Sequence, residues 1–336
     1  MKLFEHIILV TLALLLAVSL FVGCNDTQKQ PEAEPTATPE NVNVMVLNGT
    51  TGFGMAKLIS DNKSGTASLP YTIQVETDAS NITASLISGA CDIAALPTNA
   101  AANLYNKTQG GVKVIAVNTL GVLYVMNNTE KVAITSFEDL RGKTVYCPAQ
   151  NPNFLFKAVC EANGLKVGED IVIDNTYAQP ADLRTALASG MVDVAVLPEP
   201  MVTIAKSANA SLTASLDLTA EWEKHYPENS LMQGCVVVRT AFLEQYPDAV
   251  NAFLAEYKAS IEFVNQTPDQ AGAMIVDAGI FAQAAVAQKA IPNSNICYID
   301  GAEMKTGLEK FFEILYAVAP ASVGNALPDA DFYYVP

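Results

Sequence analysis

The chain has 336 residues, of which 50% are hydrophobic and 16% are charged, so it is long and apolar enough to form two globular domains with their own cores. Its 35 acidic residues outnumber the 19 basic ones and give a formal net charge of −16. A surface of that charge repels phosphate backbones, which excludes nucleic acid as an expected partner.

The N-terminal region predicts export, followed by a tether. An uncharged apolar stretch from Ile7 to Gly23 follows Lys2 and His6, which predicts a signal peptide over residues 1–23. A retained membrane helix is the alternative, because this stretch is at the short limit for crossing a bilayer. Residues 24–41 contain three prolines and no large apolar side chain, so they predict a tether without a core.

From Val42 onward, apolar strand-like runs alternate with helical patterns, which is typical of a parallel sheet covered by helices. The first series predicts strands at Val42–Leu47, Tyr71–Glu76, Ile93–Leu96 and Val112–Val117, and helices at Phe53–Asp61, Ala79–Ile87 and Asn99–Tyr105. The pattern restarts after Ser136 and predicts strands at Thr144–Tyr146, Ile171–Ile173 and Val192–Leu197, and helices at Asn153–Asn163 and Ala181–Ala188. The chain therefore predicts two similar α/β lobes.

A repeated phrase supports two similar lobes. Leu86–Pro97 and Leu187–Pro198 share a Ser-Gly pair, an Asp, an apolar run and a final Leu-Pro, and they begin 187 − 86 = 101 residues apart. Each copy is typical of a helix end, a glycine in the left-handed conformation and a strand. The spacing is too long for a solenoid, whose periods are about 20 to 50 residues.

Two glycine-led apolar segments, Gly121–Met126 and Gly234–Arg239, are predicted to be strands that cross between the lobes. The expected helices at Asp248–Asn265 and Gly301–Ala317 then return to the first lobe. This interpretation assigns residues 42–122 and 236–336 to the first lobe and residues 123–235 to the second. Two crossings form a hinge, and the alternative is one continuous sheet without a hinge.

Four phrases link the chain to a known family: Asn48–Gly54, Phe137–Val145, Leu197–Pro200 and Ala252–Tyr257. Together they resemble the NMT1/THI5-like group of substrate-binding lipoproteins of bacterial ABC importers, which covers nitrate, taurine, alkanesulfonate and thiamine-pyrimidine binding proteins. The resemblance runs from about Val42 to the C-terminus. It implies an α/β periplasmic-binding-protein type II fold, whose two lobes close on a ligand, and a monomer that works with an ABC permease and ATPase.

The phrase Phe21-Val22-Gly23-Cys24 resembles the bacterial lipobox, although Phe21 replaces the usual Leu. The resemblance implies that a lipid on Cys24 anchors the protein to the outer side of the bacterial cell membrane. The binding protein would then be extracytoplasmic.

Polar residues follow the expected strands, where ligands of open α/β sheets bind. The Gly49–Gly54 turn can bring backbone amides close to an oxygen-bearing ligand, but it is no nucleotide-binding motif. Thr98 and Glu199 have a second interpretation as helix caps. The predicted ligand-binding residues are Thr51, Gly52, Phe53, Thr98, Asn99, Thr119, Gln150, Asn151, Glu199 and Gln233.

The expected cargo is a small polar ligand. An ionised Glu199 favours an amino-bearing group and Phe53 can stack on a flat ring, which favours a pyrimidine-like nitrogen heterocycle. An alkanesulfonate, taurine or nitrate is the alternative cargo, and a ligand-sensing lipoprotein is the alternative role. An enzyme of the same fold is disfavoured because His225 is the one histidine outside the leader, so no catalytic, metal or cofactor site is expected.

Overall fold

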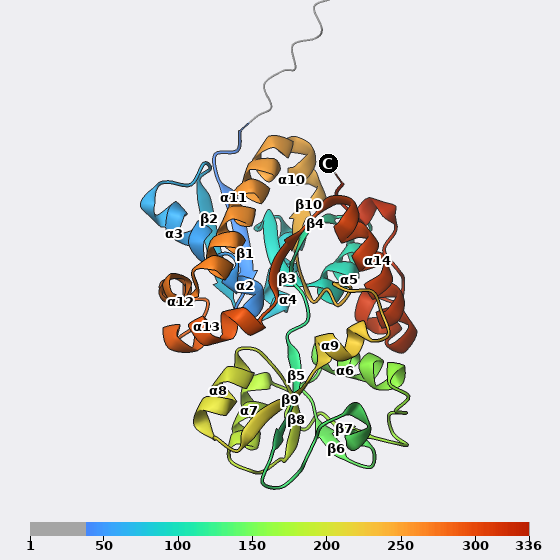
Figure 1. Cartoon of the computed structure of the whole chain (residues 1–336). Helices are drawn as coiled ribbons and strands as arrows, with labels where there is room; N and C mark the ends of the chain where they lie inside the picture. Colours follow the sequence, from blue (N-terminus) through green and yellow to red (C-terminus); the bar gives the residue numbers. More distant parts are fainter. Residues whose placement is uncertain (1–37, 336) are drawn as a thin grey trace, which may run out of the picture. The chain divides into compact units, whose positions relative to one another are not determined.

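Strands and helices alternate along the chain in the computed structural model, which describes residues 38–335 (Figure 1). The predicted signal peptide, Cys24 and most of the predicted tether lie outside the described residues. Within them, the strands form a six-stranded and a five-stranded sheet. No helix in this part of the chain is long and apolar enough to cross a bilayer.

The first sheet has the strand order β11-β4-β10-β3-β1-β2. Strand β1 pairs in parallel with β2 and β3, whereas β10 runs antiparallel to both β3 and β4. The strands of this sheet are β1 Val42–Leu47, β2 Tyr71–Glu76, β3 Ile93–Pro97, β4 Val112–Thr119, β10 Gly234–Arg239 and β11 Ile296–Ile299.

The second sheet repeats this arrangement in the order β9-β5-β8-β6-β7. Strand β8 pairs in parallel with β6 and antiparallel with β5, as β3 does with β1 and β10. Strands β3 and β8 end the two copies of the repeated phrase, so the repeat occupies the same place in both lobes. The strands of this sheet are β5 Leu123–Asn128, β6 Thr144–Tyr146, β7 Val172–Asp174, β8 Val194–Pro198 and β9 Leu212–Asp217.

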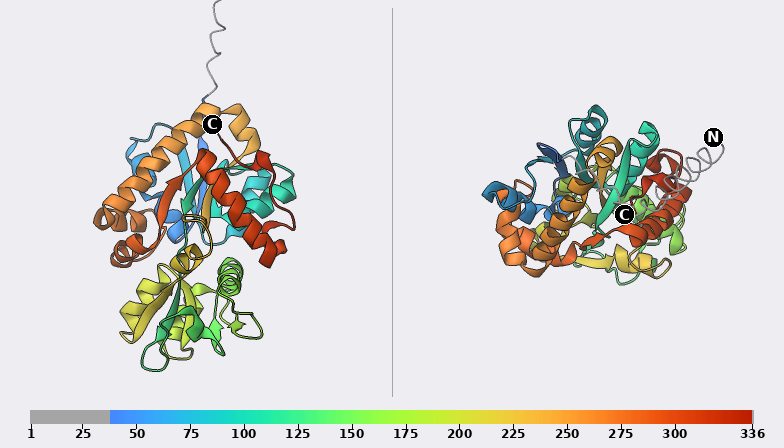
Figure 2. Two further views of the ribbon diagram at one scale, coloured as in Figure 1. Left: turned by 45° about the vertical axis from the view of Figure 1, so that its right-hand side comes forward. Right: turned by 90° about the horizontal axis from the view of Figure 1, so that it is seen from above.

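Helices cover both faces of each sheet, as Figures 1 and 2 show. They are α2 Thr50–Phe53, α3 Ala56–Ser64, α4 Ala79–Ser88, α5 Thr98–Thr108, α6 Asn151–Ala162, α7 Pro180–Ala188, α8 Met201–Ala208, α9 Leu218–Glu223, α10 Thr240–Gln245, α11 Pro247–Gln266, α12 Pro268–Asp277, α13 Ala284–Ala290 and α14 Gly301–Val318. Residues 38–335 also form short 3₁₀ helices, which are η1 Phe137–Leu140, η2 Ile291–Asn293, η3 Pro320–Val323 and η4 Ala330–Phe332.

Three apolar clusters form the core. One joins a face of the first sheet to α3, α11, α12 and α13, and a second joins a face of the second sheet to α7 and α8. The third is continuous across both lobes, because it includes Val114 of β4, Val145 of β6, Phe156 of α6 and Phe311 of α14. The remaining faces of the two sheets therefore share one core.

Most elements expected from the sequence are present with nearly the expected bounds. The expected helix Phe53–Asp61 is wrong in one respect, because α2 ends at Phe53 and α3 begins at Ala56. The last helix, α14, contacts β4 of the first lobe as expected, and it also contacts α6 of the second lobe. The two sheets are separate, which excludes the single continuous sheet.

The chain passes between the sheets just before β5 and just before β10. The sequence analysis predicted that these two strands cross between the lobes. Instead, β5 pairs within the second sheet and β10 within the first, and the chain crosses in the segments that precede them. The two passages lie side by side. The backbone N–H of Gln233 donates to the Thr119 carbonyl at 3.0 Å, and the backbone N–H of Val122 donates to the side-chain Oε1 of Gln233 at 2.7 Å. Gly121 fits this close approach because a Cβ there would lie 2.1 Å from Thr219 Oγ1.

Candidate functional site

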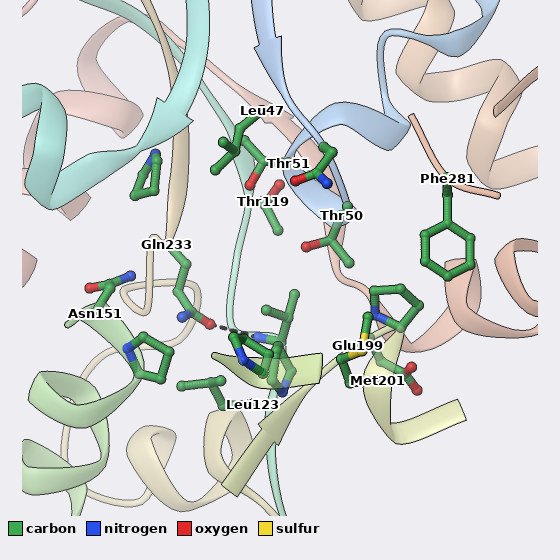
Figure 3. A pocket seen from close by; sticks show the side chains of 18 residues that line it. Leu47, Thr50, Thr51, Thr119, Leu123, Asn151, Glu199, Met201, Gln233 and Phe281 are labelled. Carbon is green, nitrogen blue, oxygen red and sulfur yellow. Dashed lines mark hydrogen bonds between the residues drawn. The ribbon is translucent and has the colours of Figure 1, made fainter. Parts of the chain in front are cut away.

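A pocket of about 290 Å³ lies between the two sheets, where strands of both end (Figure 3). Its walls include the last residues of β1, β3 and β4 in the first sheet, and residues at the start of β5 and the end of β8 in the second. A cavity of this size is at the lower end of the range for small-molecule sites. The residues that line this first pocket are Leu47, Asn48, Gly49, Thr50, Thr51, Pro97, Thr119, Val122, Leu123, Asn151, Pro152, Pro180, Pro198, Glu199, Pro200, Met201, Gln233 and Phe281.

Five helices begin at this pocket. Thr50, Asn151 and Pro180 are the first residues of α2, α6 and α7, while Pro97 and Pro200 immediately precede α5 and α8. The first turn of a helix has free N–H groups and a partial positive charge, although proline supplies no N–H of its own. Helices α2, α5, α6 and α7 have no side-chain cap, so their first turns favour a ligand with hydrogen-bond acceptors.

Glu199 is 3% exposed, and its carboxylate is bound to the first turn of helix α8. Its Oε2 accepts a hydrogen bond from the Thr203 N–H at 3.1 Å, and its Oε1 accepts one from Thr203 Oγ1 at 3.0 Å. In Figure 3 its carboxylate lies beside the ribbon of α8, away from Gln233 and Asn151. The capping interpretation of Glu199 therefore describes its hydrogen bonds, and its role toward a ligand stays a prediction, since Glu199 also lines the pocket.

Burial raises the pKa of Glu199 above its usual value of 4.5, against the opposing effect of the two bonds from Thr203. The folded protein then holds this proton to higher pH than the unfolded chain does, so stability falls as pH rises from 4.5 to the raised pKa. In Glu199→Gln this loss is absent. We expect the free energy of unfolding of the variant, relative to the wild type, to increase with pH across that window.

Urea unfolding of both proteins, followed by far-UV circular dichroism between about pH 4 and pH 7, measures this difference. A difference that stays constant over the whole range contradicts the raised pKa of Glu199.

Other polar side chains of the first pocket differ in how many of their hydrogen-bonding atoms already have a partner within the protein. Gln233 Oε1 accepts from the Val122 N–H, so its amide NH₂ is the part left for a ligand. Thr119 Oγ1 donates to Asn118 Oδ1 at 3.1 Å. Asn151 Oδ1 is buried and has no hydrogen-bond partner among the described residues. Because a buried unpaired acceptor costs about 1–3 kcal/mol, Asn151 is the residue most in need of a ligand group.

The structure brings together half of the residues predicted from the sequence. Thr51, Thr119, Asn151, Glu199 and Gln233 line the first pocket.

Two predicted residues lie inside the protein instead. Phe53 is fully buried and packs edge-on against Phe281, with ring centroids 6.2 Å apart. Thr98 is also fully buried, and its hydroxyl donates to the Met232 carbonyl at 2.7 Å. Neither side chain lines the first pocket, because Phe53 at the end of α2 and Thr98 at the start of α5 each fill a position in the core.

Three further predicted residues also lie outside the first pocket. Gly52 leaves no room for a side chain, since a Cβ there would lie 2.6 Å from the Leu47 carbonyl oxygen. Asn99 and Gln150 line a second pocket, of about 320 Å³. Whether any of the ten predicted residues binds a ligand stays a prediction.

Sequence reasoning missed the aromatic residue that does line the pocket. Phe281 belongs to the loop between α12 and α13, which reaches the site where the Gly49 N–H donates to the Ile280 carbonyl at 3.4 Å. No strand or motif precedes it, so the sequence held no local signal. Four of the five lining prolines did have one, because each lies at the start of a helix or immediately before it, whereas Pro198 ends β8.

His225, the histidine considered for chemistry, lies after α9, is exposed and does not line the first pocket. Within residues 38–335, no group of three His, Cys, Asp or Glu side chains is placed to hold a metal ion.

The fold defines the class of protein. Two α/β lobes, each with the same strand order around a central antiparallel strand and joined by two passages, are the architecture of periplasmic binding proteins of type II. The model of the family described as NMT1/THI5 like matches residues 66–271, which is more than half of the chain. The chain belongs to the NMT1/THI5-like family.

Solved structures share this fold. A protein described as an ABC transporter from Parabacteroides distasonis has 25% sequence identity and a TM-score of 0.74, covering 89% of this chain and 99% of that one. The periplasmic aliphatic sulphonate binding protein SsuA from Escherichia coli has 14% identity and a TM-score of 0.68, covering 89% and 93%. The nitrate-binding protein NrtA from Synechocystis PCC 6803 has 11% identity and a TM-score of 0.58, covering 86% of each chain. A search of curated proteins found no match.

Proposed function

We propose that this protein is the extracytoplasmic solute-binding component of an ABC importer and closes its two lobes on a small polar ligand. The observation that carries the proposal is the first pocket, whose walls come from both lobes and from the starts of five helices. A ligand that contacts both walls stabilises the arrangement in which they are close, and so shifts the population toward the closed form. Family membership and the similarity to a protein named as an ABC transporter support this role.

The proposal includes the expected cellular arrangement. A lipid on Cys24 would hold the protein at the membrane and residues 24–41 would link it to the lobes. The protein would act as a monomer that delivers its ligand to a permease and ATPase. Labelling with a radioactive fatty acid tests the anchor, since Cys24→Ala should then lose the label.

The lining of the first pocket bears on the ligand. It contains no lysine or arginine, and the carboxylate of its one acidic residue, Glu199, is bound to Thr203. A bare oxyanion would lose its hydration shell there with only the partial charges of the helix starts to compensate. A neutral ligand with both donors and acceptors matches the amides of Asn151 and Gln233 and the helix N–H groups together.

We therefore favour a flat, neutral nitrogen heterocycle of the pyrimidine type, on different residues from those first expected. Phe281 replaces Phe53 as the aromatic side chain at the pocket, and Asn151 replaces Glu199 as the acceptor for a ligand N–H. A sulfonate or nitrate remains the competing ligand, because the uncapped starts of α2, α5, α6 and α7 favour an anion.

Thermal unfolding of the full chain in detergent, with a panel of aminopyrimidines, taurine, alkanesulfonates and nitrate, tests the proposal. A ligand at about 100 times its Kd adds about 2.7 kcal/mol of stability, which is a shift of several degrees in Tm. A shift with pyrimidines alone supports the heterocycle, and a shift with sulfonates or nitrate alone supports the anion. If no member of the panel shifts the Tm of protein freed from co-purified ligand, the proposed ligand classes are wrong.

Asn151→Ala is expected to weaken binding of the ligand found in this way by about 1 kcal/mol, or about fivefold in Kd, because one hydrogen bond in a dry site is lost. Isothermal titration calorimetry measures the change. Asn153→Ala is the matched control, since Asn153 lies one helical half-turn further along α6 and does not line the pocket.

Asn151→Asp separates the two ligand classes. A carboxylate at this position repels an oxyanion but still accepts a hydrogen bond from a ring N–H. Unchanged affinity in Asn151→Ala would remove Asn151 from the binding site.

A further inference from the structure

The second pocket, of about 320 Å³, is built from polar side chains of both lobes. Helices α4 and α5 and the 3₁₀ helix η3 form its first-lobe side, and Gln150, immediately before α6, comes from the second lobe. It is nearly equal in volume to the first pocket but shares none of its lining residues. The residues that line it are Asp78, Ala79, Ser80, Thr83, Ile87, Asn99, Ala100, Asn103, Leu104, Lys107, Gln150 and Ser322.

One face of α5 supplies the polar wall of this pocket. Asn99, Asn103 and Lys107 follow one another at intervals of four residues, so they lie along one side of the helix. Lys107 has no ion-pair or hydrogen-bond partner for its ammonium group among the described residues. The one carboxylate of the lining, Asp78, already accepts a hydrogen bond from the Ser80 N–H at 2.8 Å as the cap of α4. The lining therefore holds one cation and one carboxylate, and its Lys107 ammonium forms no ion pair with the protein.

Two buried oxygen atoms in the same lining also lack partners. Ser322 is 7% exposed and its Oγ makes no hydrogen bond, and the same holds for the buried Oδ1 of Asn99. Native proteins pair most of their buried polar atoms, so unpaired atoms in a cavity wall are unusual. Both have free acceptor capacity but almost no accessible surface, so each side chain has to turn toward the cavity to accept a hydrogen bond from a hydroxyl or amino group placed there.

We propose that the second pocket binds a small organic anion that carries hydroxyl or amino groups. Its carboxylate would pair with the Lys107 ammonium, and its hydrogen-bond donors would reach Asn99 Oδ1 and Ser322 Oγ. This site is separate from the first pocket, and its occupation does not depend on which ligand the first pocket takes.

Three carboxylates of similar size test the role of the hydroxyl groups, because propionate has no hydroxyl group, lactate has one and glycerate has two. Calorimetric titration of the full chain in detergent is expected to show affinity rising about two- to tenfold for each added hydroxyl, since each finds an unpaired acceptor. Ser322→Ala is expected to reduce the advantage of glycerate over lactate or of lactate over propionate.

Lys107→Met is expected to weaken the binding of glycerate at least tenfold, because it removes the only cation of the lining while keeping the length of the side chain. Lys289→Met is the matched control, since Lys289 is also an exposed lysine in the last turn of a helix, α13, and does not line this pocket. Equal Tm values of the variants and the wild type show that the fold is kept.

The absence of saturable binding of glycerate, or binding that neither Lys107→Met nor Ser322→Ala weakens, overturns the proposal. The ligand panel for the first pocket contains none of these three probes, so the two tests fail or succeed separately.

Discussion

Replacing Asp92 by alanine is expected to lower the free energy of unfolding by about 3–5 kcal/mol, whereas the same change at Asp193 should cost about 1 kcal/mol or less. These two residues occupy the same place in the repeated phrase, three residues after Gly89 and Gly190. Both glycines are left-handed, with φ of 80° and 74°. The difference therefore comes from what surrounds each carboxylate.

Asp92 is 5% exposed and is fully engaged. Its Oδ1 accepts from Arg239 Nη2 at 2.7 Å, and its Oδ2 accepts from the Asn43 N–H at 3.0 Å and from Asn43 Nδ2 at 3.1 Å. Arg239 also donates from Nε to the Cys91 carbonyl at 3.1 Å. Removing the carboxylate leaves the guanidinium and the Asn43 amide without their partner in a largely dry place, and such a loss is costly.

Asp193 has an equivalent partner in a wetter place. Lys131, just beyond β5, donates to Asp193 Oδ1 at 2.8 Å and to the Gly190 carbonyl at 3.2 Å. The two charged side chains are 45% and 42% exposed, so water replaces most of the lost interaction.

Chemical unfolding of the two alanine variants, followed by circular dichroism, measures both losses. An m-value equal to that of the wild type shows that each variant exposes the same surface on unfolding. Salt should weaken the Asp193 pair far more than the Asp92 pair, because exposed charges are screened. Equal losses in the two variants would contradict this account.

The comparison also shows how far the sequence predicts the fold. The repeated Asp and Gly indicated one α/β unit used twice, and β3 and β8 indeed hold equivalent places between a parallel and an antiparallel neighbour. The cations that pair with these Asp residues could not be found in the same way. Arg239 is 147 residues from Asp92 and Lys131 is 62 residues from Asp193, and only the sheet order brings each pair together.

The strands β9 and β11 were not predicted from the sequence. Leu212–Asp217 is rich in Ser and Thr, and Ile296–Ile299 has four residues, so neither has the long apolar run that predicts a strand. They form the outer strands beside β5 and β4, where pairing with an existing edge supplies what their composition lacks.

The place of the first pocket was predicted from the sequence, but the orientation of its side chains was not. The rule that ligands bind beyond strand ends located Thr51, Thr119, Asn151, Glu199 and Gln233 at the first pocket. Which way a side chain points at such a position depends on partners further along the chain. Thr203, four residues after Glu199, binds its carboxylate.

Trp222→Ala is the second change with a large expected effect, a loss of about 3–5 kcal/mol in the free energy of unfolding. Trp222 is fully buried in α9, on the passage from the second lobe back to the first. Its ring packs against Tyr226 and against Phe311 of α14, with centroids 4.4 and 6.0 Å away. Its Nε1 donates to the buried Ser230 hydroxyl at 2.8 Å. Alanine therefore leaves a large cavity and removes a donor.

The cavity would open in the cluster that both lobes share, so its effect should reach both sheets. Because that cluster is continuous, we expect the wild type to unfold in one transition, with circular dichroism and the fluorescence of Trp222, the single tryptophan, changing together. Trp222→Phe keeps most of the ring but lacks the N–H, so it should lose about 1–3 kcal/mol, the cost of an unpaired buried partner.

The unfolding of the two variants is followed by circular dichroism alone, because they have no tryptophan fluorescence. If Trp222→Ala costs less than 1 kcal/mol, or if the wild type unfolds in two separate transitions, the lobes do not depend on a shared core. A ligand that closes the first pocket would then have to move two independent bodies. A shared core instead restricts lobe motion to bending at the two passages, since the contact of α6 and α9 with α14 is held by close packing.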